Sequence, residues 1–141
     1  MNITLARHAE HYQFAAQVLH ELRPHLSEQA IEKQIAVQAQ QGFQVAIAWQ
    51  DERAVGVAGY WIQHKLAWGK HVYIDDLVTL PACRGQGVGE HLLSFVCEQG
   101  KAQQCVSLHL DSGVQRFDAH RFYLRHGMRI ASHHFCSDLV P

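Results

Sequence analysis

The sequence predicts an α/β fold in which helices cover both faces of a mixed, mostly antiparallel central sheet. Three observations lead to this prediction. Short apolar runs of strand length alternate with segments of helical periodicity along the chain. Hydrophobic residues make up 48% of the chain and charged residues 18%, which is a globular composition. The length of 141 residues suits one domain, and we expect residues 1–141 to form it.

Two helices are expected near the N-terminus. Apolar residues at Phe14, Val18 and Leu22 recur at helical spacing, and Pro24 ends that helix. A second helix is expected from an N-cap at Ser27 to about residue 41.

The remaining elements alternate between strand and helix. Strands are expected at 3–6, 45–49, 55–62, 71–79 and 106–110, with one or two more within 128–139. Further helices are expected at 88–99 and 118–126, and each is followed by a glycine. The chain should therefore hold six to seven strands and about four helices. The strands between 45 and 79 form an antiparallel meander, and the strand at 106–110 could lie parallel to an earlier one because it follows a helix of crossover length.

Composition excludes several function classes. The formal net charge of −1 lacks the basic excess of a nucleic-acid-binding domain. No secretory signal is visible, and no apolar stretch approaches the roughly 18 residues of a membrane span, so we expect a cytoplasmic protein with no membrane partner. The four cysteines form no CxxC pair, and we expect them to be reduced.

The most informative segment is a strand, a glycine-rich turn and an amphipathic helix over residues 75–99. Such a turn presents backbone N–H groups at a helix N-terminus, where the partial positive charge favours an anion. Glycine lets the backbone approach a phosphate closely, and Arg84 adds a fixed positive charge. The segment therefore predicts a pyrophosphate cradle.

Two well-known cradles do not match this spacing. The Walker loop requires Lys-Ser/Thr after its glycines, and none follows here. The dinucleotide fingerprint GxGxxG typically lies near the first strand of a chain, whereas this motif lies in the middle and has different spacing.

The motif does resemble that of the GNAT superfamily of acetyl-CoA-dependent N-acetyltransferases. Arg84-Gly85-Gln86-Gly87-Val88-Gly89 meets the superfamily signature [RQ]xxGx[GA], and the preceding Leu-x-x-x-Pro-x-x-Arg context at 77–84 also matches. A second block at 118–128 resembles the A-x-x-F-Y-x-x-x-G-[FM] element, and the two blocks occur in the expected order. The resemblance covers residues 43–138 well and implies the GNAT fold.

The resemblance assigns cofactor-binding roles. Acetyl-CoA is implied as cosubstrate, with its pantetheine arm paired to the backbone of Leu77, Val78 and Thr79. Its pyrophosphate would lie on the backbone of Arg84, Gly85, Gln86, Gly87, Val88 and Gly89.

The resemblance also implies catalytic residues. Tyr123 matches the tyrosine that protonates the departing thiolate, and its ordinary pKa of about 10 keeps it protonated at neutral pH. Asp75 and Asp76 are expected to point to opposite faces of a strand, so that only one faces the site. Asp76 is favoured as the base or substrate anchor, because relatives often carry an acidic residue there. Direct attack of the amine in a ternary complex is expected, rather than a route through Cys83.

The acceptor remains open at this point. The block at 116–125 is especially similar to the aminoalkylphosphonate N-acetyltransferase branch, some of which uses a divalent metal. No HxxxH pair with a third ligand accompanies His120, His133 or His134, so no metal site is expected. A small-molecule amine is favoured, especially if Trp49, Trp61 or Trp68 lines a closed pocket. Protein lysine or N-terminal acetylation and a non-catalytic acyl-CoA-binding module are the alternatives, and a homodimer is possible.

Overall fold

The computed structural model describes residues 1–141, and the chain divides into two compact units, Met1–His109 and Leu110–Pro141. Whether they form the single domain that the sequence predicts stays a prediction. The elements of the first unit are β1 (Asn2–Leu5), α1 (Ala9–Leu22), α2 (Glu28–Gln40), β2 (Gln44–Gln50), β3 (Arg53–Lys65), β4 (Gly69–Thr79), a short 3-10 turn (Pro81–Cys83), α3 (Val88–Ala102) and, at the border, β5 (Ser107–Leu110). The second unit holds α4 (Phe117–Arg125).

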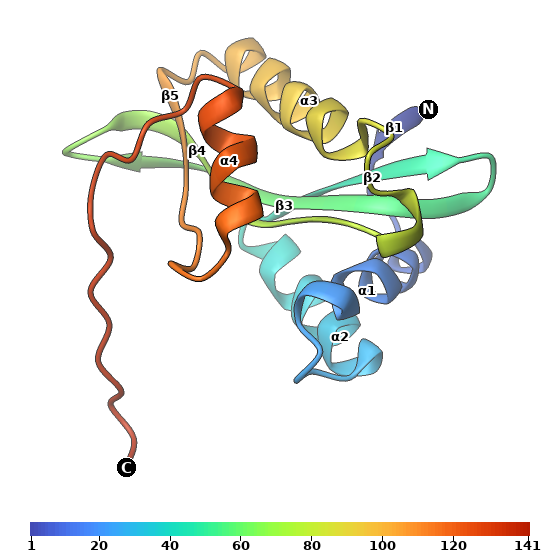
Figure 1. Ribbon diagram of the computed structural model, residues 1–141. Helices are drawn as coiled ribbons and strands as arrows, with labels where there is room; N and C mark the ends of the chain where they lie inside the picture. The colour runs from blue at the N-terminus through green and yellow to red at the C-terminus, as the bar shows by residue number, and fades with distance from the viewer. The chain divides into compact units, whose positions relative to one another are not determined.

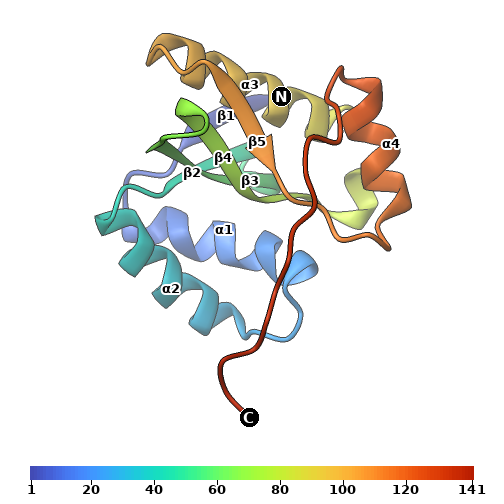
Figure 2. The same ribbon diagram turned by 90° about the vertical axis from the view of Figure 1, so that its left-hand side faces the viewer.

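The sheet has the order β1-β2-β3-β4-β5 (Figures 1 and 2). The first four strands form the predicted antiparallel meander. β5 runs parallel to β4, because the Val106 N–H donates to the Lys70 carbonyl (2.8 Å) near the start of β4 and β5 can continue alongside β4 only in the same direction. The sheet is therefore mixed, as predicted.

Helices cover both faces of this sheet. α1 and α2 lie on one face and α3 lies on the other (Figure 2). The core under α1 and α2 joins Val18 and Ile35 to Val57 and Val78 of the sheet. The predicted ends of both helices are confirmed: α1 stops before Pro24, and the Ser27 hydroxyl accepts a hydrogen bond from the Ala30 N–H (3.1 Å) at the start of α2.

The sheet has five strands, so the prediction of six to seven is wrong by one or two. No helix or strand forms between residues 128 and 141, where one or two strands were expected. Ile130 and Phe135 are exposed, and an odd spacing would place them on opposite faces of a strand. Without one apolar face to bury, the segment has little to hold it against a sheet.

None of the helices combines the length and the hydrophobicity that a bilayer-crossing helix requires.

Candidate functional site

The loop between β4 and α3 presents a row of free backbone donors. Gly85 (φ +79°) and Gly87 (φ +80°) adopt the left-handed conformation that other residues rarely take. A Cβ at Gly85 would meet no atom within 4 Å, so the backbone conformation, and not crowding, requires glycine there. The N–H groups from Gly85 to Glu90 have no acceptor in the chain, and the His91 N–H is the first to bond, to the Gly87 carbonyl (3.0 Å). These free donors lie at the N-terminus of a 15-residue helix, where an anion would be favoured, and binding of an anion by this predicted cradle stays a prediction.

The side chains of Arg84, Gln86 and His91 lie on or next to this loop. Arg84 is exposed and forms no ion pair, so its charge is available to a ligand. The Gln86 side-chain oxygen accepts a hydrogen bond from Gln50 Nε2 (2.8 Å), which ties the loop to the end of β2. His91 Nδ1 donates to the Gly87 carbonyl (2.6 Å). The Gln50 contact could not be predicted from the sequence, because it joins residues 36 positions apart.

The last residues of β4 have one unpaired edge. Leu77, Val78 and Thr79 pair on one side with β3. On the other side, β5 starts beside Lys70 and is only four residues long, so it ends before it reaches Leu77. The N–H and C=O groups on that edge can pair with another extended group, which is what the predicted pantetheine contact requires.

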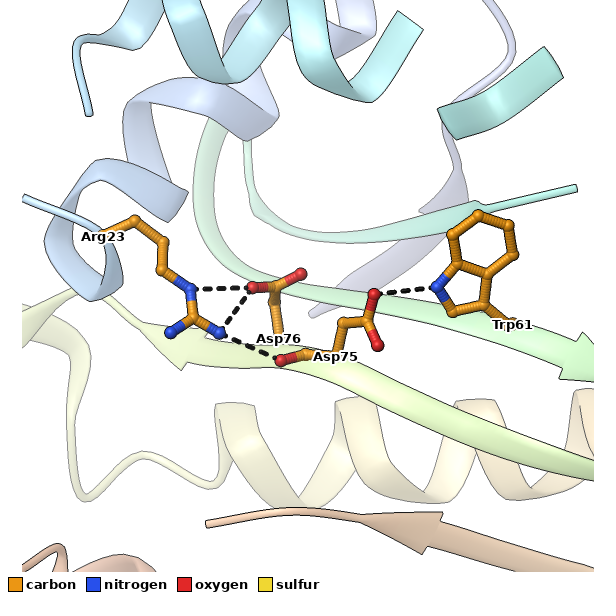
Figure 3. A network of polar contacts seen from close by, with 4 residues as sticks. All are labelled: Arg23, Trp61, Asp75 and Asp76. Carbon is orange, nitrogen blue, oxygen red and sulfur yellow. Dashed lines mark hydrogen bonds and ion pairs between the residues drawn. The ribbon is translucent and has the colours of Figure 1, made fainter. Parts of the chain in front are cut away.

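A β-bulge places both aspartates of β4 on the same face. Gly59 pairs with Asp76 and Tyr60 pairs with Ile74, which leaves Asp75 without a partner in β3. The prediction that the two side chains point to opposite faces is therefore wrong, because the bulge interrupts the alternation of the strand. Figure 3 shows both carboxylates on the side of the sheet that carries α1.

The two aspartates have different partners (Figure 3). Arg23, the residue after α1, forms an ion pair with Asp76 Oδ1 through Nη2 (3.0 Å) and donates to the same oxygen through Nε (3.1 Å). Its Nη2 also donates to the Asp75 carbonyl (3.1 Å). Asp75 Oδ2 accepts a hydrogen bond from Trp61 Nε1 (2.7 Å). Sequence reasoning missed Arg23, which belongs to no recognisable motif, and it named Trp61 only as a residue that could line a pocket, not as a partner of Asp75.

Burial sets the proton affinity of Asp76. The side chain is only 17% exposed, and this desolvation raises the pKa of its carboxyl above 3.8. The Arg23 guanidinium acts against the rise in pKa, and the neighbouring charge of Asp75 adds a smaller increase. Asp76 is therefore a stronger base than an exposed aspartate.

Tyr123 belongs to α4 in the second unit. Its ring lies edge-on to that of Phe122, with the centroids 5.4 Å apart. Burial raises the pKa of its hydroxyl, and the positive charge of Arg116 partly opposes that rise. The hydroxyl is therefore protonated at neutral pH and can donate a proton.

Two of the candidate histidines of the second unit, His120 and His134, have polar partners in the protein. His120 Nε2 bonds the Gly113 carbonyl (2.8 Å), and His134 Nδ1 lies 3.1 Å from Asp111 Oδ2. No group of three or more His, Cys, Asp or Glu side chains that could hold a metal ion occurs in the chain.

The remaining candidates lie in different places. Trp49 donates to Thr4 Oγ1 (2.9 Å), and Trp68 stacks on His109, with the ring centroids 3.7 Å apart. Only Trp61, of the three tryptophans, contacts the aspartate pair. Cys83 is buried at 4% exposure, as expected for a packing residue.

Comparisons with known proteins show which family the chain resembles. A family model described as "Acetyltransferase (GNAT) family" matches residues 6–128. An uncharacterised N-acetyltransferase of Bacillus subtilis, YhdJ, is 41% identical over 68 residues, which cover 48% of each chain. The aminoalkylphosphonate N-acetyltransferase of Salmonella typhimurium is 32% identical over 94 residues, which cover 66% of this chain and 61% of that protein. The matches thus span about half to three fifths of these relatives' lengths.

Solved structures share the fold. An aminoglycoside N-acetyltransferase in complex with CoA superimposes with a TM-score of 0.85 at 17% identity, covering 97% of this chain and 94% of that one. This likeness concerns the fold alone. The family match covers most of the sequence, including the glycine loop and the Tyr123 block. The chain therefore belongs to the acetyltransferase (GNAT) family.

Proposed function

We propose that this protein transfers the acetyl group of acetyl-CoA to a primary amine of a small molecule, by direct attack of the amine in a ternary complex. The observation that supports this most directly is the row of unpaired N–H groups from Gly85 to Glu90, beside an unpaired strand edge at residues 77–79. A phosphate-bearing ligand with an extended amide arm matches both features.

The cradle and the strand edge would bind different parts of the cofactor. The backbone from Arg84 to Gly89 would bind the pyrophosphate, with the Arg84 guanidinium adding positive charge. The edge of Leu77, Val78 and Thr79 would pair with the amides of the pantetheine arm. Bound acetyl-CoA supplies a thioester carbonyl that a neutral amine can attack.

Asp76 is proposed as the base for the acceptor. An amine is protonated at neutral pH and must lose a proton before it can attack. The raised pKa of Asp76 increases its proton affinity, and its ion pair with Arg23 fixes one oxygen, Oδ1. The other oxygen, Oδ2, can accept the proton directly or through a water.

Tyr123 is proposed as the acid that protonates the leaving thiolate. Its raised pKa keeps the hydroxyl protonated throughout the neutral range. A phenylalanine at this position would retain the ring but remove the proton donor, which makes Tyr123→Phe the appropriate variant.

The experiment follows the release of free thiol from acetyl-CoA with a panel of amines. The panel holds monoamines, diamines, aminoalkylphosphonates, an aminoglycoside and a lysine peptide. Turnover of small amines, with a lower kcat in Tyr123→Phe and an unchanged dissociation constant for acetyl-CoA, supports the proposal. Turnover of the peptide alone would contradict the small-molecule acceptor, and CoA binding without turnover would favour a non-catalytic module.

A further inference from the structure

The Asp75 carboxylate has a held oxygen and a free one. Oδ2 is fixed by the indole N–H of Trp61 at 2.7 Å, whereas Oδ1 has no hydrogen bond or ion pair in the structure. The side chain is exposed, and no lysine, arginine or histidine pairs with its carboxylate. Asp75 thus presents an oriented negative charge that the protein leaves uncompensated.

Arg23, the cation that contacts the two aspartates, already uses two of its three nitrogens in bonds to them. Its Nε and Nη2 both point to Asp76 Oδ1, and Nη2 also bonds the Asp75 carbonyl (Figure 3). Arginine recognises phosphate and phosphonate groups best through two parallel N–H donors. Only Nη1 has no partner, so Arg23 cannot offer two parallel donors from adjacent nitrogens without giving up Asp76 or the Asp75 carbonyl. The two carboxylates and the guanidinium together carry one net negative charge.

The position of Asp75 along β4 relates it to the proposed cofactor. The cradle follows the C-terminal end of β4, and the unpaired edge at residues 77–79 precedes it. A ligand that extends from the cradle along this edge runs toward the bulge. Thr79 lies four positions after Asp75, and at about 3.3 Å per position the two are roughly 13 Å apart along the strand. The reactive end of such a ligand, and the acceptor that meets it, therefore lie near the bulge.

We propose that Asp75, held by Trp61, binds a second positive charge of the acceptor, so that the preferred substrates are diamines or polyamines and not amines that carry a phosphonate or phosphate. This inference rests on the proposed acetyl transfer and specifies its acceptor class. Asp76 takes the proton of the reacting amine, while Asp75 holds an ammonium group that does not react. Trp61 acts as a positioning residue, because it touches Asp75 and not the reacting atoms.

Matched acceptors test this assignment. The thiol-release assay compares 1,4-diaminobutane and spermidine with butylamine, which lacks the second charge, and with 2-aminoethylphosphonate, which carries an anion. We expect the diamine and the polyamine to have the highest kcat/KM. Asp75→Asn keeps the side-chain shape and the acceptor for Trp61, and should raise the KM for the diamine about fivefold, a modest change because the site is exposed. The KM for butylamine should change little.

Two further variants separate recognition from general damage. Trp61→Phe removes the N–H that orients Asp75, so it should reduce the preference for diamine over monoamine while Asp75 keeps its charge. Glu52→Gln removes one exposed acidic charge at the β2–β3 turn and should leave the preference unchanged. The dissociation constant for acetyl-CoA, measured for each variant, shows that the fold is intact.

The outcomes distinguish the two proposals. Thiol release with an equal preference for diamine and butylamine, or with 2-aminoethylphosphonate as the best acceptor, overturns the role of Asp75 but not acetyl transfer. A preference that survives Asp75→Asn also overturns it. Absence of thiol release with every amine, despite intact acetyl-CoA binding, contradicts the proposed transfer itself and with it the assignment of Asp75.

Discussion

Gly56 of β3 lets α3 lie close to the sheet, and replacing it with alanine tests how the cradle is positioned. An added Cβ would lie 2.6 Å from Val88 Cγ1, 2.9 Å from Leu92 Cδ1 and 3.3 Å from the Val78 carbonyl oxygen. Carbon atoms in contact prefer about 3.5–4.0 Å, so α3 must move away from β3 by about 1 Å. Val88 is the first residue of α3, and the free N–H groups lie around it, so the cradle must move with the helix.

The expected cost follows from this overlap. Overpacking of a buried site destabilises the fold by about 1–3 kcal/mol. Replacement of glycine also reduces the entropy of the unfolded chain, which stabilises by about 0.4–1 kcal/mol and does not cancel the overlap. We therefore expect Gly56→Ala to lower the free energy of unfolding by about 1–2 kcal/mol, measured by urea denaturation. Calorimetric titration should show CoA binding weakened by about tenfold. This corresponds to a loss of about 1.4 kcal/mol in binding free energy when the loop is displaced.

A double-mutant cycle controls for general damage. Val88→Ala removes the atom nearest to the added Cβ, and by itself leaves a small cavity. The Gly56→Ala/Val88→Ala variant should lose less stability than the sum of the losses of the two single variants, because the new methyl group fills part of that cavity. Additive losses, or a Gly56→Ala variant with the stability and CoA affinity of the native protein, would refute the packing argument.

Three further predictions concern the loop and the two proposed catalytic groups. Gly85→Ala forces a residue with a Cβ to adopt φ +79°, and should cost about 1 kcal/mol of stability and weaken CoA binding. Gly85→Asn should cost less, since asparagine tolerates this conformation. If the two variants lose equal stability in denaturation and equal CoA affinity in titration, the role of φ is contradicted. The raised folded pKa of Asp76 means that the native state binds its proton more tightly than the unfolded state, so its contribution to stability is present below the unfolded pKa and is lost as pH rises above 3.8 through the folded pKa. Urea denaturation across this range should show a smaller decrease for Asp76→Asn than for the native protein, and an identical decrease would exclude Asp76 as the source. Tyr123→Phe should lower kcat about 10²-fold or more with acetyl-CoA affinity retained, and steady-state kinetics with an unchanged kcat would remove Tyr123 from the mechanism.

Local patterns predicted most of the first unit correctly. Pro24 and Ser27 mark chain breaks and caps through their own backbone chemistry, so the ends of α1 and α2 agree with the expectation. The glycine loop was identifiable because a positive φ favours glycine, and the glycines at positions 85 and 87 are visible in the sequence.

Features that depend on pairing between distant segments were not predictable. The bulge at Asp75 depends on the register between β3 and β4, which no local pattern specifies, and it places the two aspartates on the same face where opposite faces were expected. The Arg23–Asp76 ion pair joins residues 53 positions apart, and neither residue is unusual in its own segment. The apolar residues after Gly127 suggested strands, but a strand forms only when a neighbour pairs with its backbone.

The most direct test of the central claim follows both products of the reaction in one vessel. The protein is mixed with acetyl-CoA and 1,4-diaminobutane or another amine of the panel, free thiol is measured by absorbance, and the amine is analysed by mass spectrometry. We expect one acetylated amine for each thiol released, at a rate proportional to the protein concentration. Thiol release without acetylated amine would show hydrolysis instead of transfer, and no thiol release with any amine would contradict the assignment of this protein as an N-acetyltransferase.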